Sequence, residues 1–232
     1  MEERYHLLYA AAAVRGNIIK LGKTSFLPPE LYEKELYELS REECERILEV
    51  GCSLGIKLYH FKKSDRTLPR VNKVLGFLKS IYFENLLDVG SGRGVFLLPF
   101  LDEFDGIPVT AVDILKKRIE LLSDIRRGGV ERLSVVEADI CAAPFGEGSF
   151  DVVTMLEVLE HIPNVREAVR AAVKAARKYV VVTVPSKEDS NPEHIHLLTK
   201  EKLIALFREA GVNKLKFDGV PGHLFMVASI ER

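Results

Sequence analysis

The stretch that decides the fold reads Asp88-Val89-Gly90-Ser91-Gly92-Arg93-Gly94. The apolar pair Leu86-Leu87 precedes it and apolar residues 95–98 follow it, which is the pattern of a buried strand, a glycine turn and the start of a helix. Three glycines in five positions let the backbone turn sharply and come close to a ligand, because glycine has no Cβ. Such a turn brings the ligand to a helix N-terminus, where unpaired N–H groups point outward. Glycines alone also fit an ordinary tight turn, so residues further along the chain must decide the role of this one.

From residue 84 onward, apolar runs alternate with helix-like stretches. The runs cover residues 86–89, 109–112, 133–137, 150–156 and 179–184, and the helical patterns cover 95–104, 116–127 and 165–176. This alternation predicts a parallel sheet with right-handed crossovers. A last helix over 200–210, with Thr199 as N-cap and Gly211 beyond its end, then precedes two strands at 215–217 and 225–230. We predict an α/β fold with a doubly wound, mostly parallel seven-stranded sheet and antiparallel C-terminal strands.

Residues 1–80 form a predicted helical N-terminal extension, and residues 81–232 form the α/β domain. The patterns favour helices over 3–14, 30–39, 41–54 and 70–82. Gly16 would close the first helix, and Pro29 suits the first position of the second. Ser40, followed three residues later by Glu43, is a capping-box signature for the third. We expect the extension to cover a substrate pocket or to dock a substrate.

The composition is that of a folded globular protein with no strong charge. The chain has 232 residues, 47% of them hydrophobic, and a formal net charge of −1, so nothing drives it as a whole toward nucleic acid or membrane. Its three cysteines have no metal-ligand spacing, which indicates a reducing compartment. No apolar run reaches the length of a membrane span. These features predict a cytoplasmic protein with no membrane partner.

Residues 57–80 are the exception to this balance. Seven Lys and Arg residues stand there against Asp65 alone, a net charge of +6, with Tyr59, His60 and Phe61 among them. Basic residues mixed with aromatic ones can follow an RNA backbone while the rings stack on bases. The alternative is a solvated basic face with Tyr59 and Phe61 packed inward.

Two carboxylates extend the glycine turn into a cofactor site. Asp113 ends the second strand, 23 residues after Gly90, where it can accept hydrogen bonds from both ribose hydroxyls of an adenosine-type cofactor. Asp139 follows the third strand, where it can accept a hydrogen bond from an adenine amine. Both would lie with Asp88 at the carboxyl ends of parallel strands, where open α/β sheets bind ligands. The alternative is that these are capping or loop carboxylates with no ligand.

In order, the segments LLDVGSGRG (86–94), AVDI (111–114), VEADI (136–140), FDVVTMLEVLEHI (150–162) and VVVTVPS (180–186) resemble class I S-adenosylmethionine-dependent methyltransferases. The resemblance runs from about Glu84 to the C-terminus and implies S-adenosyl-L-methionine as cofactor. By this resemblance, the methionine portion contacts Asp88, Gly90 and Gly92, the ribose Asp113, the adenine edge Asp139, the adenine ring Ile114 and Ile140, and the end of the fourth strand adds Leu156. A nicotinamide dehydrogenase is the alternative within the fold, but its loop normally has a third glycine where Val95 stands.

The segment after the fourth strand, Glu157-Val158-Leu159-Glu160-His161, would face the acceptor. Glu157 and His161 are the predicted catalytic residues, since either could act as a general base toward an alcohol. We assign no metal. The alternative comes from metal-dependent RNA 2′-O-methyltransferases with a similar segment, in which Glu157, Glu160, His161 and His194 would bind Mg²⁺ or Mn²⁺. Residues 185–192 would form a mobile acceptor-side loop or a solvated connector.

The predicted function is S-adenosylmethionine-dependent methyl transfer to an unassigned acceptor. We favour a small metabolite that enters beside Glu157 and His161. One alternative is an RNA methyltransferase that docks RNA on the basic stretch 57–80, with or without a metal. The other is a non-catalytic cofactor-binding regulator or partner subunit.

Overall fold

A computed structural model shows a seven-stranded sheet with the strand order β3-β2-β1-β4-β5-β7-β6. The structure describes residues 2–61, 67–142, 145–188 and 191–231. Five strands are parallel: β1 (Leu86–Val89), β2 (Val109–Asp113), β3 (Leu133–Glu137), β4 (Phe150–Leu156) and β5 (Ala176–Pro185). Two are antiparallel, β6 (Lys214–Val220) and β7 (His223–Ser229), joined through Pro221-Gly222. The predicted fold class is confirmed.

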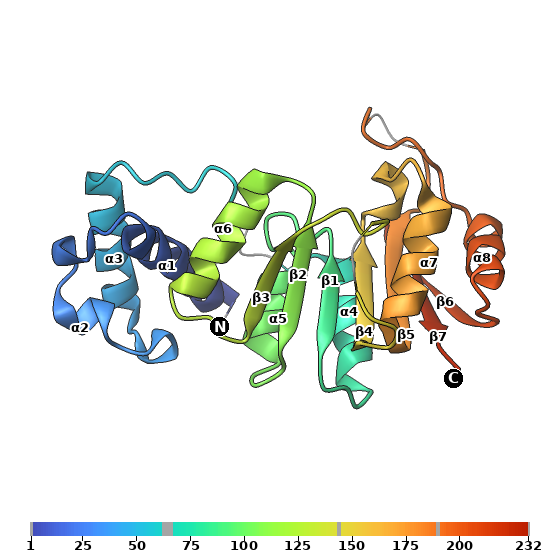
Figure 1. Cartoon of the computed structure of the whole chain (residues 1–232), viewed down its shortest axis with the longest axis horizontal. Coiled ribbons are helices and arrows are strands. Elements are labelled where there is room, and N and C mark those ends of the chain that lie inside the picture. The colour runs from blue at the N-terminus through green and yellow to red at the C-terminus, as the bar shows by residue number, and fades with distance from the viewer. Residues whose placement is uncertain (1, 62–66, 143–144, 189–190, 232) are drawn as a thin grey trace.

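Helices cover both faces of the sheet, because successive strand residues point to opposite sides. Leu86 belongs to the core on the face of α4 (Pro69–Lys79), α5 (Leu97–Glu103) and α6 (Lys116–Arg127). Its neighbour Leu87 belongs to the core under α7 (Val165–Ala175) and α8 (Lys200–Glu209). Figure 1 shows α7 and α8 in front of the sheet and α4 and α5 behind it. This is the doubly wound arrangement that the sequence predicts.

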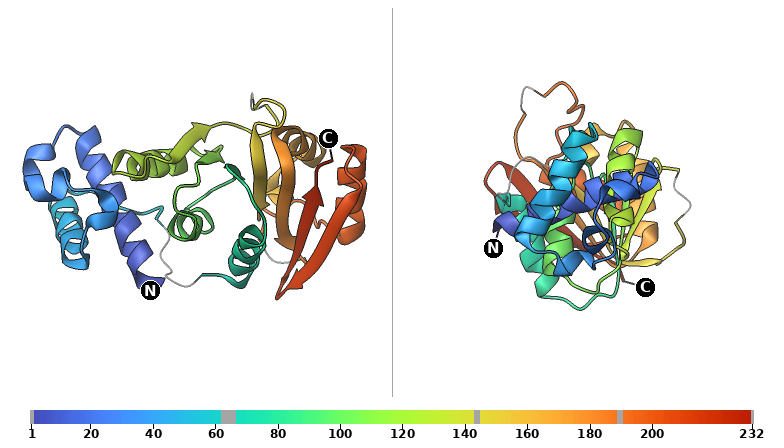
Figure 2. Two further views of the ribbon diagram at one scale, coloured as in Figure 1. Left: turned by 90° about the horizontal axis from the view of Figure 1, so that it is seen from below. Right: turned by 90° about the vertical axis from the view of Figure 1, so that its left-hand side faces the viewer.

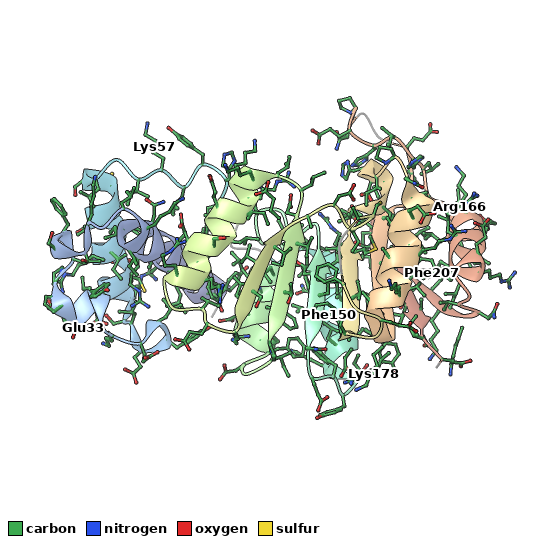
Figure 3. All side chains as sticks on the ribbon, in the orientation of Figure 1. Glu33, Lys57, Phe150, Arg166, Lys178 and Phe207 are labelled. Atoms are coloured by element: carbon green, nitrogen blue, oxygen red, sulfur yellow. The ribbon has the colours of Figure 1, made fainter. Side chains whose placement is uncertain are left out.

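Buried and paired side chains fix α7, α8 and the end of the sheet at which the parallel strands begin. Phe207 of α8 is fully buried, and Arg166 of α7 pairs with Glu209 of α8 at 2.8 Å. At the amino end of β5, Lys178 donates to the fully buried carboxylate of Asp151 at 2.9 Å. Figure 3 labels Phe207 and Arg166 at one end of the molecule and Lys178 below the sheet. The carboxyl ends of the parallel strands lie at the opposite end of the sheet.

Residues 2–60 form a helical lobe beyond the β3 edge, as Figures 1 and 2 show. It contains α1 (Glu2–Lys20), α2 (Pro29–Tyr32) and α3 (Arg41–Ser53), with 3-10 turns at Thr24–Phe26 and Leu36–Glu38. The capping box is confirmed, since the Glu43 amide donates to Ser40 Oγ at 3.2 Å and the Ser40 amide to Glu43 Oε2 at 2.6 Å. Within the described residues, no helix is both long and apolar enough to cross a membrane.

Two helix predictions in this lobe were wrong. The expected helix over 30–39 is broken into α2 and a 3-10 turn, with Glu35 in an extended conformation between them. The first helix does not end before Gly16 but continues to Lys20. Gly16 lies inside α1 because tertiary packing, not helix termination, requires a residue without a Cβ at this position.

α1 and α6 cross at very short range, which only glycine permits. A Cβ on Gly16 would lie 1.8 Å from the carbonyl oxygen of Asp124, and one on Gly128 would lie 1.9 Å from that of Ala12. The buried Arg15 donates from Nε to the Gly128 carbonyl at 2.8 Å, at the C-terminal end of α6. Terminal helix carbonyls lack partners within their own helix, so Arg15 supplies one. The lobe is therefore fixed to the α/β domain through α6.

We predict opposite effects for two glycine-to-alanine changes inside helices. Gly16→Ala should lower the free energy of unfolding by about 2 kcal/mol, because the new methyl group must displace the backbone of α6. Gly76→Ala in α4, where a Cβ would meet nothing within 4 Å, should raise it by about 0.5–1 kcal/mol through helix propensity. Urea denaturation followed by circular dichroism measures both. Equal stabilisation by the two changes would contradict the close crossing.

Candidate active site

A cavity of about 580 Å³ opens at the carboxyl ends of β1, β2 and β4, beside the N-terminal turn of α4. This volume is within the range of small-molecule and cofactor sites. All ten predicted site residues line it: Asp88, Gly90, Gly92, Asp113, Ile114, Asp139, Ile140, Leu156, Glu157 and His161. The structure thus brings together residues that lie up to 73 positions apart in the sequence. Their individual roles stay predictions.

The glycine loop has a left-handed backbone at each of its glycines. Gly90, Gly92 and Gly94 have φ values of +69°, +58° and +77°. A Cβ on Gly90 would also lie 2.5 Å from Val158, whereas one on Gly92 would meet no atom closer than 3.7 Å. Gly90 is therefore required by its conformation and by protein packing. Gly92 is required by its conformation, and its open side leaves room in the cavity.

Asp113 holds this loop against the end of β2. Its Oδ2 accepts the Gly92 amide at 2.9 Å, and its Oδ1 accepts the Leu115 amide at 2.9 Å. Arg118 Nη1 lies 3.5 Å from Oδ2, at the far limit of a hydrogen bond. Each carboxylate oxygen can accept a second hydrogen bond, so Asp113 can still accept hydrogen bonds from the hydroxyl groups of a ligand.

Asp88 is the buried carboxyl group of the site. Burial raises its pKa to about 7, while the Thr154 hydroxyl, which donates to Oδ1 at 2.8 Å, acts in the opposite direction. A nearby cation favours the ionised form of such a buried carboxyl group. Asp88 is thus suited to an ammonium group such as that of an amino-acid tail.

The other end of the cavity presents apolar surface next to a carboxylate. Ile114 is 66% exposed although it is a large apolar side chain, and Ile140 is buried. Asp139 is exposed, and its Oδ1 accepts the Cys141 amide at 2.9 Å, which fixes the carboxylate at the end of β3. An exposed apolar side chain on a cavity wall suits a flat ring, and a fixed carboxylate suits an amine. The wall fits the predicted adenine contacts.

Glu157 has a strained backbone and a fixed side chain. Its φ is +58°, a backbone conformation that residues other than glycine rarely adopt and that often marks a functional site. Its Oε1 accepts the Thr183 hydroxyl at 2.8 Å, and its Oε2 lies 3.0 Å from His223 Nε2. Arg70 Nε lies 3.9 Å from Oε1. The carboxylate is held by donors from β5 and β7, with Arg70 of α4 nearby.

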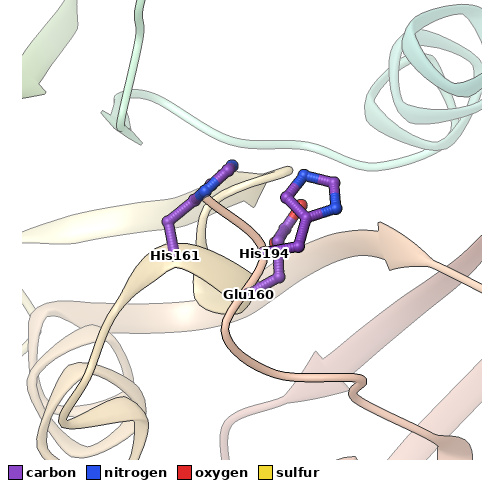
Figure 4. Close-up of side chains that lie close together, drawn as sticks. All are labelled: Glu160, His161 and His194. Atoms are coloured by element: carbon purple, nitrogen blue, oxygen red, sulfur yellow. The ribbon is translucent and has the colours of Figure 1, made fainter. Parts of the chain in front are cut away.

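His161 ends the 3-10 turn Leu159–His161 and lines the cavity. Its Nδ1 lies 2.9 Å from the Glu193 carbonyl oxygen, so Nδ1 carries the proton and the neutral ring has a lone pair on Nε2. Figure 4 shows its ring next to that of His194, with Glu160 close to both. The ligand atoms of these three residues lie within 4.8 Å of one another, a spacing that could hold a cation. Glu157, the fourth candidate of the metal alternative, is held by Thr183 and His223.

Sequence reasoning missed Arg70 and His223 as site residues. Arg70 appeared only as one member of a basic stretch, yet it lines the same cavity as the glycine loop. His223 follows the turn between β6 and β7 and shows no local motif. Only the antiparallel pairing of β7 with β5 brings it to Glu157.

Several described residues of the basic stretch 57–80 contact other parts of the protein. Phe61 is buried and contacts His6, as the alternative of inward packing predicts, whereas Tyr59 is 62% exposed. Lys62, Lys63, Asp65 and Arg66 lie outside the described residues. Three basic side chains on α4 pair with carboxylates of other elements, namely Arg70–Glu157, Lys73–Asp218 and Lys79–Glu103.

The predicted acceptor-side loop 185–192 lies at the cavity edge of the sheet. Its Ser186 amide donates to the Gly222 carbonyl at 3.0 Å, and Glu193, just beyond it, lines the cavity. Asp189 and Ser190 lie outside the described residues. The mobility of this loop stays a prediction.

Part of the α/β domain matches a known protein family. Residues 87–182 match the sequence profile of a family described as a methyltransferase domain. The chain is similar to 27-O-demethylrifamycin SV methyltransferase of Amycolatopsis mediterranei, at 26% identity over 64% of this chain and 61% of that protein. It is also similar to the ubiquinone biosynthesis O-methyltransferase of Bordetella parapertussis, at 35% identity over 42% of this chain and 40% of that protein. The chain thus spans less than two thirds of these relatives.

Solved structures share the fold at low sequence identity. A SAM-dependent methyltransferase from Aquifex aeolicus superposes with a TM-score of 0.59 at 19% identity, covering 73% of this chain and 94% of that one. The YcgJ protein from Bacillus subtilis also gives a TM-score of 0.59, at 14% identity, covering 70% of this chain and 98% of that one. Both superpositions leave more than a quarter of this chain uncovered.

We predict that Asp88 makes the ligand-free protein less stable as the pH rises. Its folded pKa of about 7 exceeds the ordinary 3.8, so the stability associated with its protonated form is present below pH 4 and is lost as pH rises through 7. Asp88→Asn keeps an acceptor for Thr154 but cannot ionise. Relative to wild type, it should gain on the order of 4 kcal/mol between pH 4 and pH 8 in urea denaturation, at about 1.4 kcal/mol per pKa unit.

Asp151→Asn serves as a control of opposite sign. Burial of Asp151 would raise its pKa, but hydrogen bonds from Arg177 and Lys178 outweigh burial and lower it. Its stabilising contribution is therefore present above the unfolded pKa and lost in acid, so Asp151→Asn should cost most at neutral pH. Parallel stability curves for wild type and Asp88→Asn would contradict the role of burial at Asp88.

Proposed function

Because residues 87–182 match the profile of a methyltransferase domain, we propose that the protein transfers a methyl group from S-adenosyl-L-methionine to a hydroxyl oxygen of a small molecule. One observation carries this proposal: the cavity that gathers the cofactor residues also exposes His161, whose ring has its free lone pair on Nε2. Cofactor and proton acceptor thus share one site.

The residues of the cavity fit the cofactor along its whole length. The amino-acid tail would lie along the glycine loop, with its ammonium group near Asp88 and its carboxylate near Arg70. Asp113 would accept hydrogen bonds from the ribose hydroxyls, and Asp139 from the adenine amine. The adenine ring would lie between Ile114 and Ile140, with Leu156 completing the wall. Arg93, which is exposed between two glycines, also lines the cavity and is a second cation near the tail.

The chemistry requires an aligned acceptor and somewhere for its proton to go. When bound, S-adenosyl-L-methionine supplies a methyl group on a positively charged sulfur. The acceptor oxygen would take the methyl group, and the electron pair of the carbon–sulfur bond would stay on sulfur. His161 Nε2 would receive the hydroxyl proton, with the ring held by the Glu193 carbonyl. Alignment of acceptor and methyl group in the cavity supplies much of the remaining rate.

Small molecules are the acceptors that the observations favour. The relatives named above are a 27-O-demethylrifamycin SV methyltransferase and a ubiquinone biosynthesis O-methyltransferase. Lys73 and Lys79 of α4 are paired with carboxylates, which leaves them less available to a phosphate backbone. Turnover of methyl-labelled cofactor against a lysate separated into metabolite, RNA and protein fractions tests this. Label in the metabolite fraction supports the proposal, and label confined to RNA or protein overturns it.

Among the described residues of the helical extension, 1–80, only those of its last helix contribute to the site in this proposal. Arg70 and Val71 of α4 line the cavity. The lobe of α1 to α3 packs on α6 instead of over the cavity, so we propose a supporting role for the lobe. A cytoplasmic location stays a prediction.

We predict that His161→Gln lowers kcat by about 10²–10³ while the dissociation constant of S-adenosylhomocysteine changes little, because a neutral amide cannot take up a proton. The measurement is turnover of labelled cofactor with the metabolite fraction. His196→Gln is the matched control. His196 Nε2 bonds the Ile162 carbonyl at 3.1 Å, which the amide can also do. The control should keep near wild-type turnover.

Chelation separates this role of His161 from the metal alternative. After dialysis against EDTA, the proposal predicts unchanged turnover, since no step uses a cation. Lost turnover that returns with Mg²⁺ or Mn²⁺ would show instead that Glu160, His161 and His194 hold a cation. His161 would then be a ligand and not the proton acceptor.

A further inference from the structure

We infer that His223 is a positioning residue of the active site: by binding Glu157, it leaves the Arg70 guanidinium available for the carboxylate of the cofactor tail. The inference rests on the function proposed above. It concerns a residue from the hairpin between β6 and β7, which no sequence motif connects to the site.

His223 faces a hydrogen-bond acceptor on each side of its ring. Nε2 lies 3.0 Å from Glu157 Oε2, and Nδ1 lies 3.0 Å from the Pro221 carbonyl oxygen. A carbonyl oxygen and a carboxylate oxygen can only accept, so both contacts are satisfied when both ring nitrogens carry hydrogen. The hydrogen on Nε2 then gives Glu157 Oε2 a hydrogen-bond donor.

The remaining contacts of Glu157 fix its second oxygen. Thr183 donates its hydroxyl to Oε1 at 2.8 Å, and the Glu157 amide donates to the Thr183 carbonyl at 2.9 Å. The left-handed backbone at Glu157 is thus tied to β5 at two points. A carboxylate held by Thr183 and His223 has little freedom to turn toward another cation.

Arg70 is near this carboxylate without being bonded to it. Its Nε lies 3.9 Å from Glu157 Oε1, which is too long for a hydrogen bond. Within the described part of the chain, this is the one polar contact of Arg70, and its side chain lines the cavity. The guanidinium fork therefore remains open to a ligand carboxylate, which it can bind in a bidentate manner.

The hydrogen bonds of Glu157 explain why His223 matters to Arg70. With Oε1 bonded to Thr183 and Oε2 bonded to His223, the carboxylate is satisfied, and Arg70 is left for the tail. Without His223, Oε2 would lose its donor and the carboxylate would pair with Arg70, since the two are already within 4 Å. The arginine would then be drawn from the cavity, and the site would lose its attraction for a carboxylate but not for adenosine.

Two ligands that differ in the tail test this inference. S-adenosylhomocysteine has the carboxylate, and 5′-methylthioadenosine lacks the amino-acid tail. By calorimetry, His223→Phe should weaken S-adenosylhomocysteine about tenfold and leave 5′-methylthioadenosine within about twofold of wild type. His223→Gln, which can still donate to Glu157, should recover most of the lost affinity. Arg70→Met should show the same selective loss, and His223→Phe should add little to it in the double variant.

Lys73→Met is the matched control. Lys73 also joins α4 to the same hairpin, through Asp218 on β6, but it does not contact Glu157. Its affinities for both ligands should stay near wild type. Equal weakening of both ligands by His223→Phe, or no weakening, would overturn the positioning role while leaving the proposed function intact. Failure of the wild type to bind S-adenosylhomocysteine would overturn both.

Discussion

The site depends on the two hydrogen bonds that the Asp113 carboxylate accepts from the Gly92 and Leu115 amides. They join the glycine loop after β1 to the end of β2, and the loop amides of Gly90 and Ser91 add bonds to the Val112 carbonyl. Because β1 and β2 are parallel neighbours, both strands end at the same edge of the sheet. The loop is thereby fixed beside the cavity, which the other site residues also line.

The fold could be predicted because its signals are local. The periods of apolar residues gave β1, β3, β4 and α6 with the bounds that the structure has, and Ser40 with Glu43 marked the start of α3. Parallel topology then placed the strand-end carboxylates Asp88, Asp113 and Asp139 together. Contacts such as those of Ile114 and Ile140 were predicted from the family resemblance, and all ten predicted site residues line one cavity.

The rest could not be predicted, because it depends on contacts between distant segments. Gly16 appears as a helix terminator in the sequence, but it lies inside α1 where α6 passes within the reach of a Cβ. Arg70 and His223 are 153 residues apart and meet only around Glu157, through α4 on one side and an antiparallel hairpin on the other. A pattern read along the chain contains neither the crossing of α1 and α6 nor this meeting around Glu157.

Calorimetric titration of S-adenosylhomocysteine tests the central claim, that the strand-end cavity is a cofactor site organised by Asp113. The account predicts saturable one-to-one binding by the wild type. Asp113→Asn should weaken it at least about tenfold, since a charged hydrogen-bond partner contributes about 1.5–3 kcal/mol. Glu137→Gln, at the neighbouring position of β3, should bind as the wild type does. No binding by the wild type, or undiminished binding by Asp113→Asn, would contradict the account.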